Sequence, residues 1–212
     1  MKKIILLALA LLLPAAADAA DAALDRPYWS LEIKGGVFAP ALGNWEQYYG
    51  TSNMPVYEGA LAYKLLRQVE VGVGVGSAKD KGQAYAPNHG TTSGQVTYEL
   101  YPINVFVLLR GIGSESQWLV PYVGGGWTRM YYRQKVEDQG TVSGSVNGYH
   151  VRGGLQLDLN GLDPDAANDM YMDYGVFHTY FFVEAEQTKA RLSSAAVDLG
   201  GTAYLMGLMF EF

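Results

Sequence analysis

The stretch VEVGVGVGS, Val69–Ser77, alternates strictly between valine and small or polar residues. Because successive side chains of a β-strand point to opposite faces, this period of two predicts a strand with one valine face. The other face carries Glu70 and three glycines, which leave room for longer side chains from neighbouring strands. Arg67 and Gln68 then form a predicted two-residue turn, and the stretch 57–65 before it alternates in the same way. Together the two stretches predict a β-hairpin.

The same alternation recurs along the rest of the chain. It predicts eight antiparallel strands, at about 28–38, 57–65, 69–77, 95–109, 119–134, 148–159, 175–186 and 198–212. The connections alternate between short turns and longer polar segments rich in Gly, Ser and Thr. The long ones are predicted at about 40–53, 78–94, 135–147 and 187–197. An even strand number with alternately short and long connections is typical of an up-and-down membrane barrel.

The connection at about 160–174 departs from this pattern, because a short turn is expected there. It contains several aspartates, and Asp163 is followed by Pro164. Aspartate before proline suits a helix N-cap with proline at the first helical position. The segment therefore predicts a short acidic helix.

Composition limits the class of protein. The chain has 212 residues, 49% of them hydrophobic and only 17% charged, against about 25% charged in an ordinary soluble domain. It contains 26 Gly, 16 Tyr and no Cys, and its net charge is −6. The charge argues against a nucleic-acid partner. The lack of cysteine excludes disulfides, thiolate metal sites and cysteine nucleophiles, and the glycine and aromatic content favours a β protein.

The first residues indicate export. Lys2 and Lys3 precede an apolar run, 4–13, that is too short to span a membrane and is followed by small residues. This pattern predicts a cleavable signal peptide, 1–19, although cleavage after Ala17 or Ala22 is also possible. The predicted organisation is then a short periplasmic segment, 20–27, followed by one barrel domain, 28–212.

The strands of a soluble β-sandwich would also show alternating hydrophobicity. The choice between a sandwich and a membrane barrel therefore depends on strand length and on the residue types of the two strand faces. The predicted strands are longer than the usual five or six residues and reach the roughly 9–11 that a tilted membrane span needs. Charged residues and glycines lie opposite the apolar faces, which suits a polar lumen and a lipid-facing exterior. The predicted fold is therefore all-β, an eight-stranded antiparallel up-and-down transmembrane β-barrel. Its interfacial aromatic girdles would comprise Trp29, Tyr63, Tyr101, Tyr122, Tyr132 and Phe212.

These features resemble the small bacterial outer-membrane barrels of the OmpA/OmpX/OmpW type. The resemblance rests on the signal peptide, the eight-strand pattern, the stretches Pro121–Gly126 and Gly148–Gly154, and the terminal strand ending in Phe212. It implies a place in the outer membrane of a Gram-negative cell, in contact with its lipids and lipopolysaccharide. It also implies insertion by the barrel assembly machinery, with Phe210 and Phe212 as the assembly signal.

Charges of both signs fall on faces predicted to point into the barrel. Because an unpaired buried charge is costly, they are expected to form hydrogen-bonded pairs in the lumen. A lumen filled by such pairs predicts a plugged barrel, and a looser arrangement predicts a narrow polar channel. The predicted network comprises Glu32, Lys34, Glu58, Lys64, Glu70, Glu99, Arg129, Arg133, Arg152, Glu184 and Glu186.

No pattern in the sequence predicts catalysis, a cofactor or a metal. The glycines at 72, 74 and 76 lie inside a strand and lack the spacing of a dinucleotide-binding loop. Two histidines, His150 and His178, belong to separate predicted strands. A lipid-modifying enzyme would need His178 to meet a hydroxyl and a carboxylate. That activity is the least favoured of three hypotheses.

The favoured hypothesis is a non-catalytic structural or surface-interaction role, in which the long loops make the contacts. The contact residues predicted for this role are Tyr48, Tyr49, Tyr85 and His89. The second hypothesis is a narrow channel or transporter for small or hydrophobic solutes. An apolar channel lined by Trp127, Tyr131, Leu205 and Met209 would favour it. The sequence does not specify a ligand.

Overall fold

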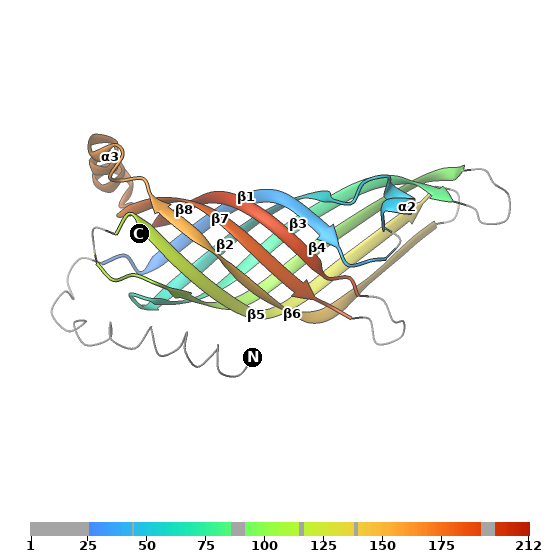
Figure 1. Ribbon diagram of the computed structural model, residues 1–212, viewed down its shortest axis with the longest axis horizontal. Coiled ribbons are helices and arrows are strands. Elements are labelled where there is room, and N and C mark those ends of the chain that lie inside the picture. The colour runs from blue at the N-terminus through green and yellow to red at the C-terminus, as the bar shows by residue number, and fades with distance from the viewer. Residues whose placement is uncertain (1–25, 44, 86–91, 115–116, 138–139, 192–197) are drawn as a thin grey trace.

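The computed structural model describes residues 26–43, 45–85, 92–114, 117–137, 140–191 and 198–212. Eight antiparallel strands close into one barrel in sequence order, which confirms the predicted fold (Figure 1). The strands are β1 (Trp29–Pro40), β2 (Met54–Leu66), β3 (Val69–Tyr85), β4 (Thr92–Arg110), β5 (Leu119–Val136), β6 (Gly140–Asp158), β7 (His178–Lys189) and β8 (Gly201–Glu211). The predicted signal peptide, 1–19, and most of the segment 20–27 lie outside the described residues.

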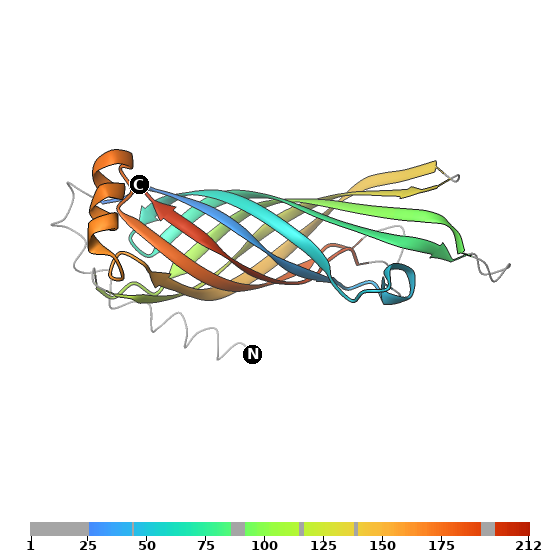
Figure 2. The same cartoon turned by 90° about the horizontal axis from the view of Figure 1, so that it is seen from above.

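The two ends of the barrel differ. The short helix α2 (Trp45–Tyr49) lies in the β1–β2 connection at one end, here called the outer end. Helix α3 (Pro164–Tyr174) and the C-terminus lie together at the opposite, inner end (Figure 1). The β3–β4 and β5–β6 pairs reach further at the outer end than the other strands (Figure 2).

Those two extended hairpins correct the predicted loops at 78–94 and 135–147. Backbone pairing continues through both, for example between Lys81 and Thr97 and between Val136 and Gly140. The side chains become polar there, but the ladder hydrogen bonds depend on the backbone and persist. Much of what reads as loop in the sequence is therefore strand.

Helix α3 forms as the sequence predicts. Asp163 is its N-cap and accepts a hydrogen bond from the backbone N–H of Ala166 at 3.0 Å, with Pro164 in the first turn. Gly175 ends the helix in the left-handed conformation, φ 69°, which glycine adopts without steric cost. Among the described residues, neither helix has the length and apolar character needed to span a membrane.

Alternate strand positions form an exposed apolar band around the barrel. On β3 the band consists of Val71, Val73 and Val75, and similar positions on the other strands carry exposed Ile, Leu, Val, Tyr and Trp. The intervening side chains are buried in the lumen, where many are charged. An apolar exterior around a polar lumen is typical of barrels that cross a membrane.

The two faces of β5 are the reverse of the prediction. Tyr122 and Met130, predicted to face lipid, are buried in the lumen, whereas Trp127 and Tyr131 are exposed outside. Tyr132 also leaves the predicted girdle, because its ring packs against the buried apolar residues of the outer end. The outer part of the lumen is itself apolar, so hydrophobicity does not distinguish the faces of β5. Of the other predicted girdle residues, Trp29, Tyr63, Tyr101 and Phe212 are exposed.

The inward glycines of β3 make room for neighbouring side chains. A Cβ atom at Gly72 would lie 2.5 Å from Cζ of Phe106 and 2.6 Å from Cβ of Ala62. At Gly74 the nearest atom, Cβ of Ala60, would be 3.5 Å away, an ordinary van der Waals contact. Two glycines on one face of one strand therefore differ in how tightly they are packed.

We expect Gly72→Ala to lower the free energy of unfolding by about 1–3 kcal/mol, because the added methyl group overpacks the lumen. Gly74→Ala is the matched control and should change it by less than about 0.5 kcal/mol. Urea unfolding of both variants in phospholipid vesicles measures the difference. Equal stability of the two variants would contradict the packing described here.

Candidate functional site

The lumen near the inner end is filled by an inner charge cluster, defined as Lys64, Glu70, Arg110 and Glu211. Arg110 is completely buried and pairs with Glu70, at 3.0 Å, and with Glu211. Lys64 also pairs with Glu211, with 2.5 Å between Nζ and Oε1. The hydroxyl of Ser30 donates to the second oxygen of Glu70. The cluster holds two cations and two carboxylates, so its charges balance.

The next layer toward the outer end is a middle charge cluster, defined as Glu32, Lys34, Glu58, Arg152 and Glu184. Arg152 makes a bidentate pair with Glu32, with N–O distances of 2.8 and 3.2 Å. Lys34 lies 2.6 Å from Glu184 and 3.3 Å from Glu58. Two cations here face three carboxylates, all with nearly buried side chains. The arrangement follows the physical requirement that buried charges be paired and hydrogen-bonded.

Neutral groups join these charges. The hydroxyl of Tyr122 donates to Glu184 at 2.8 Å. Thr128 donates to the amide oxygen of Asn104 at 2.8 Å and lies 2.7 Å from Nδ1 of His150. With its proton committed to Asn104, the threonine oxygen accepts a hydrogen bond from Nδ1–H of His150. His150 is therefore part of a structural network.

The outer part of the lumen is an outer apolar cluster, packed around α2. Trp45 of α2 is buried, stacks on Tyr49 at 3.9 Å between ring centroids and meets Tyr98 edge-on at 5.2 Å. Burial raises the pKa of the Tyr49 hydroxyl to about 12. The buried members of the cluster are Phe38, Trp45, Met54, Val56, Ala78, Tyr98, Leu100, Met130, Val146, Ala190, Leu199, Ala203 and Leu205. Trp45 thus anchors α2 in the outer part of the lumen.

The structure brings most of the predicted lumen charges together. Glu32, Lys34, Glu58, Lys64, Glu70, Arg152, Glu184 and Glu186 lie inside the barrel. Glu99, Arg129 and Arg133 do not, and this corrects their predicted position. Glu99 pairs with the exposed Lys79, and Arg129 donates to the exposed Ser145. Their placement follows from the reversed faces of β5 and from outward positions on the extended part of β4.

Sequence reasoning missed the residues at the centre of the inner charge cluster. Arg110 stands one residue beyond the predicted end of its strand, and Glu211 lies between two phenylalanines attributed to assembly. Both continue the period-two pattern of their strands, Arg110 after Leu108 and Glu211 after Met209. Extending the alternation would have placed Glu211 in the lumen, but it would have placed Arg110 outside, because Arg110 lies on the opposite strand face from Glu99, which the sequence predicts inside.

The predicted contact residues are only partly described. Tyr49 packs in the outer apolar cluster, so it helps to anchor α2 there. Tyr48 and Tyr85 belong to α2 and β3, but their side chains lie outside the described residues, and His89 lies wholly outside them. The predicted apolar channel is not assembled, because Trp127 and Tyr131 face outward while Leu205 and Met209 are buried.

The remaining catalytic candidate is a histidine–aspartate pair at the inner end. Nδ1 of His178 lies 3.2 Å from the carboxylate of Asp158. Among the described residues, no hydroxyl is recorded within hydrogen-bonding distance of the His178 ring, and no three His, Asp or Glu side chains are arranged to hold a metal ion. Within the described part of the chain, the pair thus has no hydroxyl beside it to act as the nucleophile of a serine-type hydrolase.

We expect Arg152→Ala to lower the free energy of unfolding by about 3–5 kcal/mol, because it leaves Glu32 buried without its bidentate partner and takes from Glu184 one of its two cations. Arg129→Ala removes the same side chain from the outer face and should change it by less than about 1 kcal/mol. Urea unfolding in vesicles compares the two. A similar loss of stability in both variants would show that the buried ion pairs of the lumen contribute no more to the free energy of unfolding than an exposed arginine does.

Comparisons with known proteins give relatives in structure only. No protein-family model matches the chain, and no curated protein sequence matches it. Neisserial surface protein A is similar at a TM-score of 0.57 and 11% identity, covering 87% of this chain and 97% of the other. The outer membrane protein OprG from Pseudomonas aeruginosa is similar at a TM-score of 0.54 and 13% identity, covering 88% and 97%. The chain therefore has the fold of the small eight-stranded outer-membrane β-barrels.

Proposed function

We propose that this protein is a closed, non-catalytic barrel of the bacterial outer membrane that serves as a structural and surface-contact element. The single observation that carries the proposal is the filled lumen. Two layers of buried ion pairs occupy its inner and middle parts, and the outer apolar cluster with Trp45 occupies the rest. An eight-stranded barrel has an interior that side chains can fill, so we expect no open path for solutes through the described part of the lumen.

The proposed location follows from the exposed apolar band and the fold. In hydrocarbon every backbone N–H and C=O needs a partner, and a closed barrel supplies one. The proposed partners are the lipids and lipopolysaccharide around the barrel, and the barrel assembly machinery acting on Phe210 and Phe212. Both phenylalanines lie on the outward face of β8 or just after it, and the backbone of Phe212 pairs with that of Trp29.

The extended outer end supports the surface-contact role. The β3–β4 and β5–β6 hairpins rise beyond the other strands (Figure 2). A rigid hairpin presents its tip at lower entropic cost than a long loop, because the paired strands are already ordered. Tyr48 and Tyr85, for which we propose contacts, belong to α2 and β3 and so to this end of the molecule, whereas His89 lies outside the described residues.

We expect the wild-type protein to form no stable channels in planar lipid bilayers. Arg152→Ala should open a small conductance that favours cations, because the middle charge cluster then keeps three carboxylates and one cation. Arg129→Ala, on the outer face, should stay closed like the wild type. Stable wild-type channels whose conductance changes in Arg152→Ala alone would overturn the closed-barrel proposal in favour of a narrow polar channel.

A second candidate function is the binding or passage of a small apolar solute. The observation that favours it is the outer apolar cluster, which packs around the five-residue helix α2. Such a solute would displace Trp45, whose indole N–H is buried without a partner among the described residues. The charge clusters nearer the inner end oppose passage straight through the barrel.

For this second candidate we expect Trp45→Ala to increase the affinity for an apolar fluorescent dye about tenfold or more, since it removes the largest side chain from the outer apolar cluster. Trp118→Ala is the matched control, because Trp118 is 66% exposed at the other end of the barrel. Dye titration of the detergent-solubilised protein gives both affinities. Equal dye binding by the wild type and both variants would show that the outer apolar cluster is a structural core and not a binding site.

A further inference from the structure

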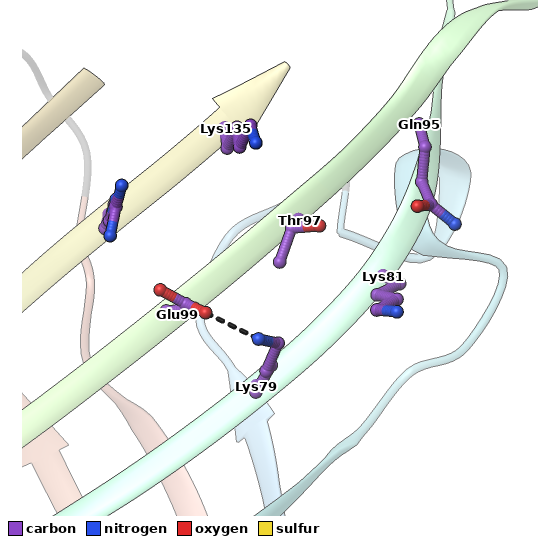
Figure 3. A pocket seen from close by; sticks show the side chains of 7 residues that line it. Lys79, Lys81, Gln95, Thr97, Glu99 and Lys135 are labelled. Atoms are coloured by element: carbon purple, nitrogen blue, oxygen red, sulfur yellow. Dashed lines mark hydrogen bonds and ion pairs between the residues drawn. The ribbon is translucent and has the colours of Figure 1, made fainter. Parts of the chain in front are cut away.

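A groove of about 330 Å³ lies outside the barrel, across β3, β4 and β5, toward the outer end. Figure 3 shows that its side chains come from three adjacent strands. The lining is polar and mostly basic. We call it the basic face, and it consists of Lys79, Lys81, Gln95, Thr97, Glu99, Arg133 and Lys135.

The sheet register arranges the basic face in two rows. The first row is Lys79, Glu99 and Arg133, and the second is Lys81, Thr97 and Lys135. Residues in register on adjacent strands have Cβ atoms about 4.5–5.5 Å apart, so each row is continuous. Four cations, one carboxylate and two neutral hydrogen-bonding side chains therefore share one surface.

The basic face begins where the apolar band ends. The row next to it, toward the inner end, pairs Tyr101 with Tyr131, and both rings are exposed. Below them on β3 and β4 the outward residues are apolar, for example Val75 in register with Ile103. Exposed tyrosines mark the interface between hydrocarbon and headgroups. The basic face is thus at the depth of the lipid headgroups.

Among the described residues, only one of its four cations, Lys79, makes an ion pair, and its partner is Glu99. Lys79 donates to Glu99 at 2.6 Å, and this hydrogen bond lowers the pKa of the Glu99 carboxyl and raises that of Lys79, so both are charged at neutral pH. Among the residues that the structure describes, no carboxylate lies within 4.0 Å of the charged nitrogens of Lys81, Arg133 or Lys135. A second carboxylate, Glu137, lies at the outer edge and accepts the backbone N–H of Gln95.

We propose that the basic face binds the phosphate groups of the anionic glycolipid of the outer leaflet, lipopolysaccharide, and so fixes one lipid against β3–β5. The proposal rests on the proposed outer-membrane location. Arginine and lysine are the usual partners of phosphate, and a cluster of them at headgroup depth is typical of a lipid-phosphate site. A free anion would use only the cations, whereas a phosphorylated lipid also contacts Tyr101, Tyr131 and the apolar band.

The test is a titration of the detergent-solubilised, full-length barrel with bisphosphorylated lipid A, with bound lipid counted by native mass spectrometry. We expect Arg133→Ser combined with Lys135→Ser to weaken binding about thirtyfold. The matched control combines Lys189→Ser with Arg191→Ser, which removes two exposed cations, also two residues apart, at the outer end of β7. The control should bind within about twofold of the wild type.

Two further arms identify the ligand chemistry. Dephosphorylated lipid A should bind the wild type about as weakly as lipid A binds the Arg133/Lys135 variant. Inorganic phosphate at millimolar concentration should not displace lipid A. Equal losses in the two double variants, or equal affinity for the dephosphorylated lipid, would overturn the proposal. Displacement by inorganic phosphate would also overturn it, because the face would then be a site for free anions.

Failure of this inference is distinguishable from failure of the proposed function. Heat-modifiable gel migration and carbonate-resistant membrane fractionation report a folded membrane barrel and do not depend on the basic face. A protein that passes both assays but shows no phosphate preference refutes the lipid site alone. A carbonate-soluble protein refutes the outer-membrane location.

Discussion

Closure of the backbone ladder between β1 and β8 is the constraint on which the rest of this molecule depends. The register runs from Ser30 with Glu211 to Pro40 with Gly201, and the N–H of Phe212 donates to Trp29 at 2.9 Å. Without this seam the sheet would expose two unpaired edges, which a membrane does not tolerate. Closure with eight strands also fixes a narrow lumen. Every inward charge must then find its partner within that lumen.

The charge clusters are a consequence of that confinement. Glu70 and Arg110 come from the neighbouring strands β3 and β4, whereas Glu211 comes from β8 at the far end of the chain, and they meet because the barrel brings these strands around one axis. Such pairs do not stabilise a fold strongly by themselves, because desolvation offsets much of their attraction. They do penalise any shift in register, since a slip of one residue would turn the charges outward into the apolar band.

The sequence predicts the fold well because successive residues of each strand face the membrane side and the lumen in turn, and the period-two alternation follows from this. It also predicts α3, because Asp163-Pro164 is a local capping signal. Prediction fails at the outer end, where the polarity of a side chain no longer indicates whether it faces the lumen or the outside. Toward the outer end Tyr98 and Met130 face inward, while Glu99 and Arg133 face outward, as in a soluble protein. Helix α2 is equally hidden from sequence reasoning, because five residues are too few to show a helical period.

Helix α3 bears on how readily β7 pairs with β6. The connection 159–177 is far longer than the two-residue turn 67–68 between β2 and β3, so bringing β7 to β6 costs more chain entropy. By folding 11 of its residues locally, between the Asp163 cap and Gly175, α3 leaves less than half of the connection as flexible chain. Each halving of a flexible loop lowers its closure cost by about 0.6 kcal/mol. The helix therefore lowers the entropic cost of pairing β7 with β6.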